Sequence, residues 1–140
     1  WLIKSRFGFN DQRMSQKFHK HYSREEARAL LPQLRKWLEQ LASLNVEFEK
    51  NERRLAGLLA SGQDTGGSLV NTSVKLQGEI RWLFREFQER EIFIKDLDRG
   101  LIDFPAIVGG KEVFLCWEKD EDDIEYWHDI DSGFASREPL

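Results

Sequence analysis

The chain has 140 residues, enough for one domain with a substantial apolar core. It is 40% hydrophobic and 33% charged, a balance typical of long helices that expose much of their surface. The formal net charge of -4 argues against nucleic acid as the main partner. A single cysteine excludes an internal disulfide and a zinc site built from several cysteines of one chain.

The N-terminal segment is basic and weakly patterned. Because the chain begins without methionine and Met14 precedes the first well-patterned stretch, residues 1–13 are expected to be an upstream extension or a segment foreign to the native protein. We take residues 1–17 as an N-terminal extension that need not be ordered, and residues 18–140 as a single domain. The basic segment from Trp1 to Arg24 could dock on the acidic run from Glu118 to Asp131, in the same molecule or in a neighbour, but solvation of both segments is the favoured interpretation.

The string "SREEARALLPQL" opens a predicted helical hairpin of about residues 23–92. Ser23 can cap the first helix, and Glu26, three residues on, completes a capping box. Pro32 removes a helical hydrogen bond and crowds the preceding turn. The sequence therefore predicts a short lead-in helix, a kink or break, and a long helix beginning near Pro32.

An apolar seam with a spacing of three and four residues runs through the long helix, and Asn51 fills its one polar slot. Its members are Leu34, Trp37, Leu41, Leu44, Phe48, Leu55 and Leu58, and the face is widened by Leu31, Leu38 and Leu59. After the turn-forming residues 61–68, a second stripe comprises Leu69, Leu76, Ile80, Leu83 and Phe87. Two such stripes joined by a short loop predict a long antiparallel, coiled-coil-like helical hairpin.

Three strands are predicted in a small β element of about residues 94–131, followed by a C-terminal tail of residues 132–140. They are Leu101–Val108, Lys111–Glu118 and Ile124–Ile130. Gly109 and Gly110 can adopt the positive φ angles of a two-residue hairpin turn. The predicted fold is α+β, a long antiparallel helical hairpin followed by a small three-stranded antiparallel sheet.

The Gly-Gly turn sets the register of the first strand pair, with Val108 opposite Lys111 and hence Asp103 opposite Cys116. One face then carries the residues predicted to cover the helices: Ile102, Phe104, Ala106, Val113, Leu115 and Trp117. Matching apolar residues places Ile124 and Tyr126 on this same face, and alternation then puts His128 there too, away from Cys116. This arrangement argues against a Cys-His-Asp nucleophile or a mixed metal site.

A ligand, if one binds, is expected where the sheet meets the chain end. The candidate ligand-binding residues are Asp96, Asp98, Asp103, Cys116, His128 and Arg137. For Cys116 and His128 the favoured interpretations are a buried small hydrophobe and a packed, hydrogen-bonded imidazole. For Arg137, pairing with the acidic run is favoured over an anion clamp. No catalytic residue, metal-ligand set or cofactor is predicted.

The strings "KDLDRGLIDFPA", "FLCW" and "YWHDIDSGFASREPL", with "YSREEARALLPQL" near the start, resemble domain-of-unknown-function family 2203 over roughly residues 18–140. The positions that match the family's pattern are Gly100, Asp103, Phe104, Pro105, Cys116, Trp117, Trp127, His128, Gly133 and Arg137. The resemblance implies a prokaryotic and cytoplasmic protein, and it assigns no catalytic role.

We expect a non-catalytic structural or protein-interaction module that self-associates through its helices, as a homodimer or larger homo-oligomer. The reason is the long seam from Leu34 to Leu58, which has only one helix of comparable length in the chain to cover it. An unidentified protein partner is the other candidate for this surface; neither nucleic acid nor a membrane is expected. The alternative is a small-molecule or metal-binding protein, or a hydrolase, with a site around Asp103 and His128.

Overall fold

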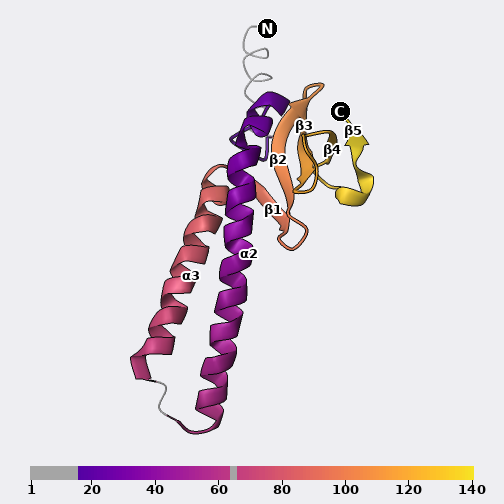
Figure 1. Cartoon of the computed structure of the whole chain (residues 1–140). Coiled ribbons are helices and arrows are strands. Elements are labelled where there is room, and N and C mark those ends of the chain that lie inside the picture. Colours follow the sequence, from indigo (N-terminus) through magenta and orange to yellow (C-terminus); the bar gives the residue numbers. More distant parts are fainter. Residues whose placement is uncertain (1–15, 64–65) are drawn as a thin grey trace.

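Two antiparallel helices form the first half of the molecule (Figure 1). The computed structural model describes residues 16–63 and 66–140. Helix α2 spans Arg24–Ala60 and helix α3 spans Gly66–Glu89. With a rise of about 1.5 Å per residue, α2 is on the order of 55 Å long, and both helices extend well past the sheet. In the described part of the chain, no helix is both long and apolar enough to cross a membrane.

Helix α2 starts where the capping signal predicts and continues through its proline. The Ser23 hydroxyl accepts a hydrogen bond from the Glu26 amide at 3.1 Å. The predicted break at Pro32 and the separate lead-in helix before it are wrong, because one helix runs from residue 24 to residue 60. Pro32 is exposed, so water can reach the carbonyl that loses its partner, and the buried Leu31 and Leu34 hold the helix on both sides.

The apolar seam of α2 packs on α3 near the sheet and along the hairpin. The Trp37 and Phe87 rings, for example, lie 5.6 Å apart. Leu38 is buried as predicted, but Leu59 is 63% exposed, so its assignment to the apolar face is wrong. Leu38 belongs to the same buried cluster as Phe104 and Trp117 of the sheet, whereas Leu59 is the last residue but one of α2, at the end of the hairpin that the sheet does not reach (Figure 1).

Asn51 is buried within the seam and joins the two helices through polar contacts. Its amide nitrogen donates to the Leu69 carbonyl at 2.9 Å and to the Ser73 hydroxyl at 2.7 Å. The Ser73 hydroxyl donates in turn to Glu52 at 2.6 Å. A satisfied polar group in an otherwise apolar seam favours one alignment of the helices, because any slip would leave it buried without partners.

The second half of the chain forms a sheet of five antiparallel strands rather than the three predicted. Their order follows the sequence: β1 (Phe93–Asp96), β2 (Leu101–Val108), β3 (Lys111–Glu118), β4 (Tyr126–Asp129) and β5 (Glu138–Pro139), with a 3-10 turn, η1 (Phe134–Ser136), before β5. The two missed strands have four and two residues, too few to show an alternating pattern.

The β2–β3 hairpin has the predicted bounds and register. Val108 pairs with Lys111, and Asp103 pairs with Cys116. Gly109 and Gly110 have φ angles of 59° and 77°, in the left-handed region that this turn requires.

Strand β4 is shorter than predicted and presents the opposite face. Phe114 pairs with His128 and Leu115 pairs with Trp127, so His128 lies on the face of Phe114 and Cys116. The prediction that His128 shares a face with Leu115 is therefore wrong. Ile124 is buried, as the pattern indicated, but it precedes the strand, and the irregular chain before Tyr126 breaks the alternation counted from it.

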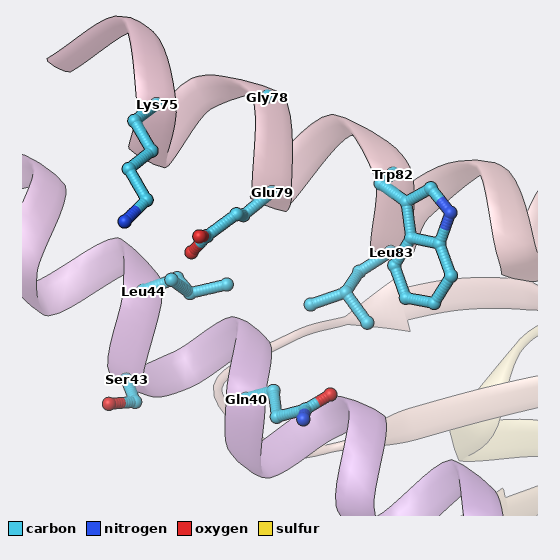
Figure 2. A pocket seen from close by; sticks show the side chains of 8 residues that line it. All are labelled: Gln40, Ser43, Leu44, Lys75, Gly78, Glu79, Trp82 and Leu83. Atoms are coloured by element: carbon cyan, nitrogen blue, oxygen red, sulfur yellow. The ribbon is translucent and has the colours of Figure 1, made fainter. Parts of the chain in front are cut away.

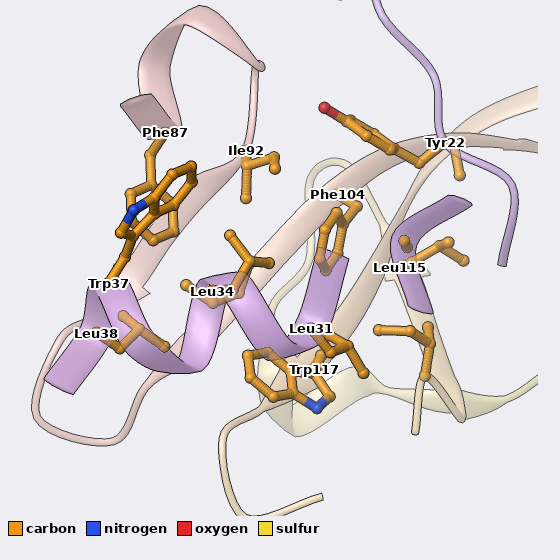
Figure 3. Packing of buried hydrophobic residues seen from close by; sticks show 14 of the residues in the cluster. Tyr22, Leu31, Leu34, Trp37, Leu38, Phe87, Ile92, Phe104, Leu115 and Trp117 are labelled. Atoms are coloured by element: carbon orange, nitrogen blue, oxygen red, sulfur yellow. The ribbon is translucent and has the colours of Figure 1, made fainter. Parts of the chain in front are cut away.

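The sheet has an inner face toward the helices and an outer face. Figure 3 shows Phe104, Leu115 and Trp117 of the inner face packed against Leu31 and Leu34 of α2. The outer face is also buried over much of its area, and its buried members are Leu101, Asp103, Pro105, Phe114, Cys116 and His128. A buried outer face needs a cover, which the chain ends supply.

Residues 16–22, here called the strap, run from the outer side of the sheet to its inner side, where the Tyr22 ring lies 5.5 Å from that of Phe104. The backbone amides of Lys17 and Phe18 donate to the Glu112 carboxylate at 2.8 and 3.1 Å. The Phe18 ring lies 5.2 Å from Phe93 and 5.3 Å from Phe114. Contact of the basic segment with the acidic run is made by Arg24, which lies 3.5 Å from Asp123. Residues 1–15 of the predicted extension lie outside the described residues.

Candidate metal site on the outer face of the sheet

Three neighbouring strands bring three metal-ligating side chains together. Asp103 of β2 lies directly across from Cys116 of β3. His128 of β4 pairs with Phe114, two residues from Cys116, so its side chain lies on the same face. A carboxylate oxygen of Asp103, the sulfur of Cys116 and a ring nitrogen of His128 all lie within 4.8 Å of one another.

All three side chains are buried. Asp103 and His128 are each 2% exposed, and Cys116 is 1% exposed. A carboxylate is almost never buried this deeply without a partner, because removal from water penalises its charge heavily. The contacts of this cluster must therefore explain how the charge is tolerated.

The hydrogen bonds of His128 determine how many protons the cluster holds. The Nδ1 atom lies 2.7 Å from the Asp129 carbonyl oxygen, which can only accept, so Nδ1 carries a hydrogen and donates it. The Nε2 atom lies 3.0 Å from Asp103 Oδ2. This second bond needs one more proton, on the ring or on the carboxyl group. With it, the His128–Asp103 pair has no net charge, which makes its burial tolerable.

The other carboxylate oxygen, Asp103 Oδ1, is buried, and no nitrogen or oxygen of the described residues donates a hydrogen bond to it; the nearby Cys116 thiol is at most a weak donor. Leaving a buried acceptor unpaired costs on the order of 1–3 kcal/mol. Such atoms are rare in folded proteins, and they often mark the place of a bound water or ion. This oxygen belongs to the residue that already contacts His128 and faces Cys116 across the strand pair.

The thiol of Cys116 is a poor nucleophile in this setting. Burial, followed by the negative charge of Asp103 and a hydrogen bond to its carboxyl group, raises the pKa of the thiol to about 12, against a smaller opposing effect of the Arg137 guanidinium. Both ring nitrogens of His128 are already engaged, so neither is free to take the thiol proton. The Cys-His-Asp nucleophile is thus disfavoured by its hydrogen bonding as well as by its pKa.

Arg137 lies beside the cluster in the C-terminal tail. Its Nη1 donates to both carboxylate oxygens of Glu121, at 2.9 and 3.1 Å. Its guanidinium lies 4.1 Å from the Tyr126 ring centroid and 4.0 Å from that of Phe134. The favoured interpretation, pairing with the acidic run, agrees with this contact. Arg137 therefore anchors the tail next to Cys116.

The other two candidate residues lie apart from the cluster. Asp96 Oδ1 accepts a hydrogen bond from the Arg99 amide at 3.1 Å and closes the turn between β1 and β2. Asp98 is exposed, and its carbonyl accepts from Lys119 Nζ at 3.4 Å. Of the six predicted residues, three converge, Arg137 adjoins them, and these two aspartates have turn and surface roles.

Sequence reasoning missed the shared face of Cys116 and His128, and it missed Glu121 as the partner of Arg137. One signal was available for the face. In "YWHD", Trp127 is the largest apolar side chain, and placing it on the inner face sends His128 outward. Ile124 was used as the reference instead, although it lies outside the strand.

The cluster fits a zinc ion in ligand type and in approximate spacing. Thiolate, imidazole and carboxylate are the three groups that bind zinc in proteins. With metal–ligand bonds of about 2.0–2.3 Å, three ligands in tetrahedral positions lie roughly 3.2–3.8 Å apart, so the cluster needs only a small contraction. The Nδ1 bond of His128 to a backbone carbonyl is the contact that commonly orients a metal-binding imidazole.

The fold and the cluster define a small α+β protein in which a helical hairpin carries a five-stranded sheet with a buried Asp-Cys-His group. The chain belongs to domain-of-unknown-function family 2203, described as an uncharacterized conserved protein (DUF2203), which it matches over residues 20–140. No curated protein and no solved structure matches the chain. The resemblance predicted from the sequence motifs is thus confirmed, and it brings no activity with it.

Proposed function

We propose that the protein binds one zinc ion through Asp103, Cys116 and His128, and that the ion ties β2, β3 and β4 together in a non-catalytic site. One observation carries the proposal. Three donors of the types that zinc prefers converge within 4.8 Å in the interior, and one carboxylate oxygen among them accepts no hydrogen bond from a nitrogen or an oxygen of the described residues.

Charge balance supports an ion of charge +2. A zinc ion bound to one carboxylate, one thiolate and one neutral imidazole gives a group with no net charge. The metal-free cluster, with a neutral thiol and a neutral Asp-His pair, also has none. Either state is therefore compatible with the interior, and zinc binding exchanges two protons for one ion.

The mixed donor set favours zinc over the other common divalent ions. Calcium and magnesium prefer oxygen donors alone, and a buried thiolate with an imidazole suits zinc or another late transition metal. We also propose a cytoplasmic location, which the free thiol supports because it fits a reducing compartment.

The depth of the site supports a structural role. Structural zinc sites are closed, whereas catalytic sites keep a position open to substrate. All three ligands are at most 2% exposed, and the strap and the C-terminal tail lie on this side of the sheet. A bound water or Asp103 Oδ1 would complete a four-coordinate ion.

The test is zinc and cobalt binding by untagged full-length protein. We expect about one zinc per chain by elemental analysis and a rise in melting temperature with added zinc. Cobalt in place of zinc should give a thiolate-to-metal charge-transfer band in the near ultraviolet. That band should vanish in Cys116→Ser, a small change in a buried position.

Asp103→Asn and Asp129→Asn form a matched pair for the same assay. Asp129 adjoins His128 in sequence, but its carboxylate lies at the surface and pairs with Lys111. Zinc binding should be lost in Asp103→Asn and kept in Asp129→Asn. Wild-type protein that takes up neither metal, or equal binding by both variants, would refute the proposal.

A further inference from the structure

A groove runs between α2 and α3 on one side of the hairpin (Figure 2). Its volume is about 560 Å³, and it is lined by Gln40, Ser43, Leu44, Lys75, Gly78, Glu79, Trp82 and Leu83. Figure 2 shows Leu44 and Leu83 pointing into the groove from the two helices, with polar side chains at its edges. An apolar centre with a polar rim is the usual composition of a protein–protein contact.

Trp82 stands beside this groove and is 54% exposed. A tryptophan offers more apolar area than almost any other side chain, and leaving half of it in water forgoes the corresponding hydrophobic stabilisation. The groove next to it is apolar at its centre and remains open. An aromatic side chain and a cavity suited to one therefore lie on the same surface.

Gly78 lines the groove one turn before Trp82, in the interior of α3. A glycine weakens a helix relative to alanine, so its presence usually has a packing reason. Within the described chain, a Cβ atom at Gly78 would meet nothing within 4 Å. The missing side chain leaves room that no neighbour in the same chain uses.

Lys75 and Glu79 supply opposite charges at the rim, one helical turn apart (Figure 2). In a twofold dimer the same patch faces itself, so a residue at one position meets a different residue of the other copy, and the contact occurs twice. Lys75 can then pair with Glu79 of the partner subunit, and Glu79 with Lys75 of the partner subunit. The patch is complementary to itself in charge.

We infer that a second copy of this chain occupies the groove. In this twofold dimer each Trp82 enters the other copy's groove beside Gly78, and Lys75 pairs with Glu79 of the partner subunit. A second copy of the chain is favoured over a different protein because the same surface carries both Trp82 and the groove that would bind it. This surface also carries both members of the ion pair, Lys75 and Glu79. None of these residues belongs to the zinc site, so the two proposals stand or fall separately.

Sedimentation velocity of the full chain between about 1 and 100 µM tests this dimer, a range that covers weak to moderate self-association. Wild-type protein should be dimeric at the upper end. Trp82→Ala should raise the dimer dissociation constant by at least about 30-fold, as expected for a central aromatic anchor.

Phe84→Ala is the matched control. Phe84 is an aromatic residue of the same helix, 41% exposed, and two residues beyond Trp82, which places it roughly 200° around the helix from that residue. It should leave the dissociation constant unchanged. Circular dichroism of each variant checks that the hairpin is intact.

Charge reversal distinguishes this dimer from other self-association. Lys75→Glu alone and Glu79→Lys alone should each weaken the dimer, and the double variant should restore it. A mixture of the two single variants should form heterodimers. A wild-type monomer at 100 µM, a dimer insensitive to Trp82→Ala, or equal loss in Phe84→Ala would each overturn the inference.

Discussion

The Asp103, Cys116 and His128 side chains owe their chemistry to burial and to one another. At a protein surface the thiol would be more reactive and the carboxyl group would be ionised. Here the hydrogen bonds of His128 hold a proton between ring and carboxylate, and burial keeps the thiol protonated. Without a metal ion the three side chains therefore hold protons, and they can act as metal ligands only when a cation replaces those protons.

Alkylation of Cys116 measures this protection directly. With a pKa of about 12, only about one thiol in 10⁴ is ionised at pH 8, and the group is buried as well. We expect iodoacetamide at pH 8 to label the native protein far more slowly than the urea-unfolded protein, as followed by mass spectrometry. Labelling of the native form as fast as that of the unfolded form would contradict this environment.

The position of Asp103 opposite Cys116 was predictable from the sequence, because the two glycines of the turn define the register over eight residue pairs. The position of His128 was not. The acidic turn between β3 and β4 has no sequence signal that defines the register of β4. An offset of one residue there moves every side chain of β4 to the other face of the sheet. The pairing of Asp103 with Cys116 thus followed from the turn residues, whereas the position of His128 depended on tertiary packing.

At the scale of the helices, burial overrides local propensity. Pro32 is a helix breaker in isolation, yet α2 continues because buried leucines flank it. The seam itself was predictable from its spacing. Leu59 is exposed, however, because periodicity predicts the side of the helix on which a residue lies but not whether another element covers that side. Only the sheet's position decides which part of a wide apolar face is buried.

The two glycines inside the helices, Gly57 and Gly78, give a matched pair of stability variants. At both sites an added Cβ would meet nothing within 4 Å. Replacing either by alanine should stabilise the monomer by about 0.5–1 kcal/mol through helix propensity. Urea unfolding at low protein concentration measures this change. The Gly78→Ala variant alone should also weaken dimerisation, and destabilisation by both would contradict the open space at these positions.

At the scale of the whole molecule, segments near both ends of the described chain lie on the outer side of the sheet. The strap binds the Glu112 and Glu91 carboxylates through four backbone amides, and the tail is held by Arg137. The order of a helical hairpin followed by a sheet was predictable from the change in periodicity along the chain. The cover was not, because the strap contacts residues more than 70 positions away and has no pattern of its own.

The attachment of the strap should depend on acid pH. Burial alone raises the pKa of Glu112, but hydrogen bonds from His21 and from the Lys17 and Phe18 amides outweigh it and hold the pKa below its usual value. A lowered pKa means that this carboxylate stabilises the folded form above its unfolded pKa. That stabilisation is lost as the pH falls through the folded pKa.

Hydrogen exchange at the Lys17 and Phe18 amides reports this contact. We expect Glu112→Ala to accelerate exchange at both amides at neutral pH, and acid to reduce the protection that the wild type shows relative to this variant. Glu47→Ala, an exposed glutamate of α2, is the matched control and should have no effect. Equal protection with and without the Glu112 carboxylate would show that other contacts hold the strap.

The order of the elements also bears on how the chain is made. The strap and α2 leave the ribosome before the sheet, and Glu112 is translated 95 residues after Lys17 and 94 residues after Phe18, the two strap residues that it binds. Until then α3 is the nearest apolar surface against which α2 can pack. The helical hairpin is therefore expected to form first, and the sheet is expected to fold against it. A nascent chain that ends before β3 would expose the sheet-facing leucines of α2, and it is at this length that we expect chaperones to bind most strongly.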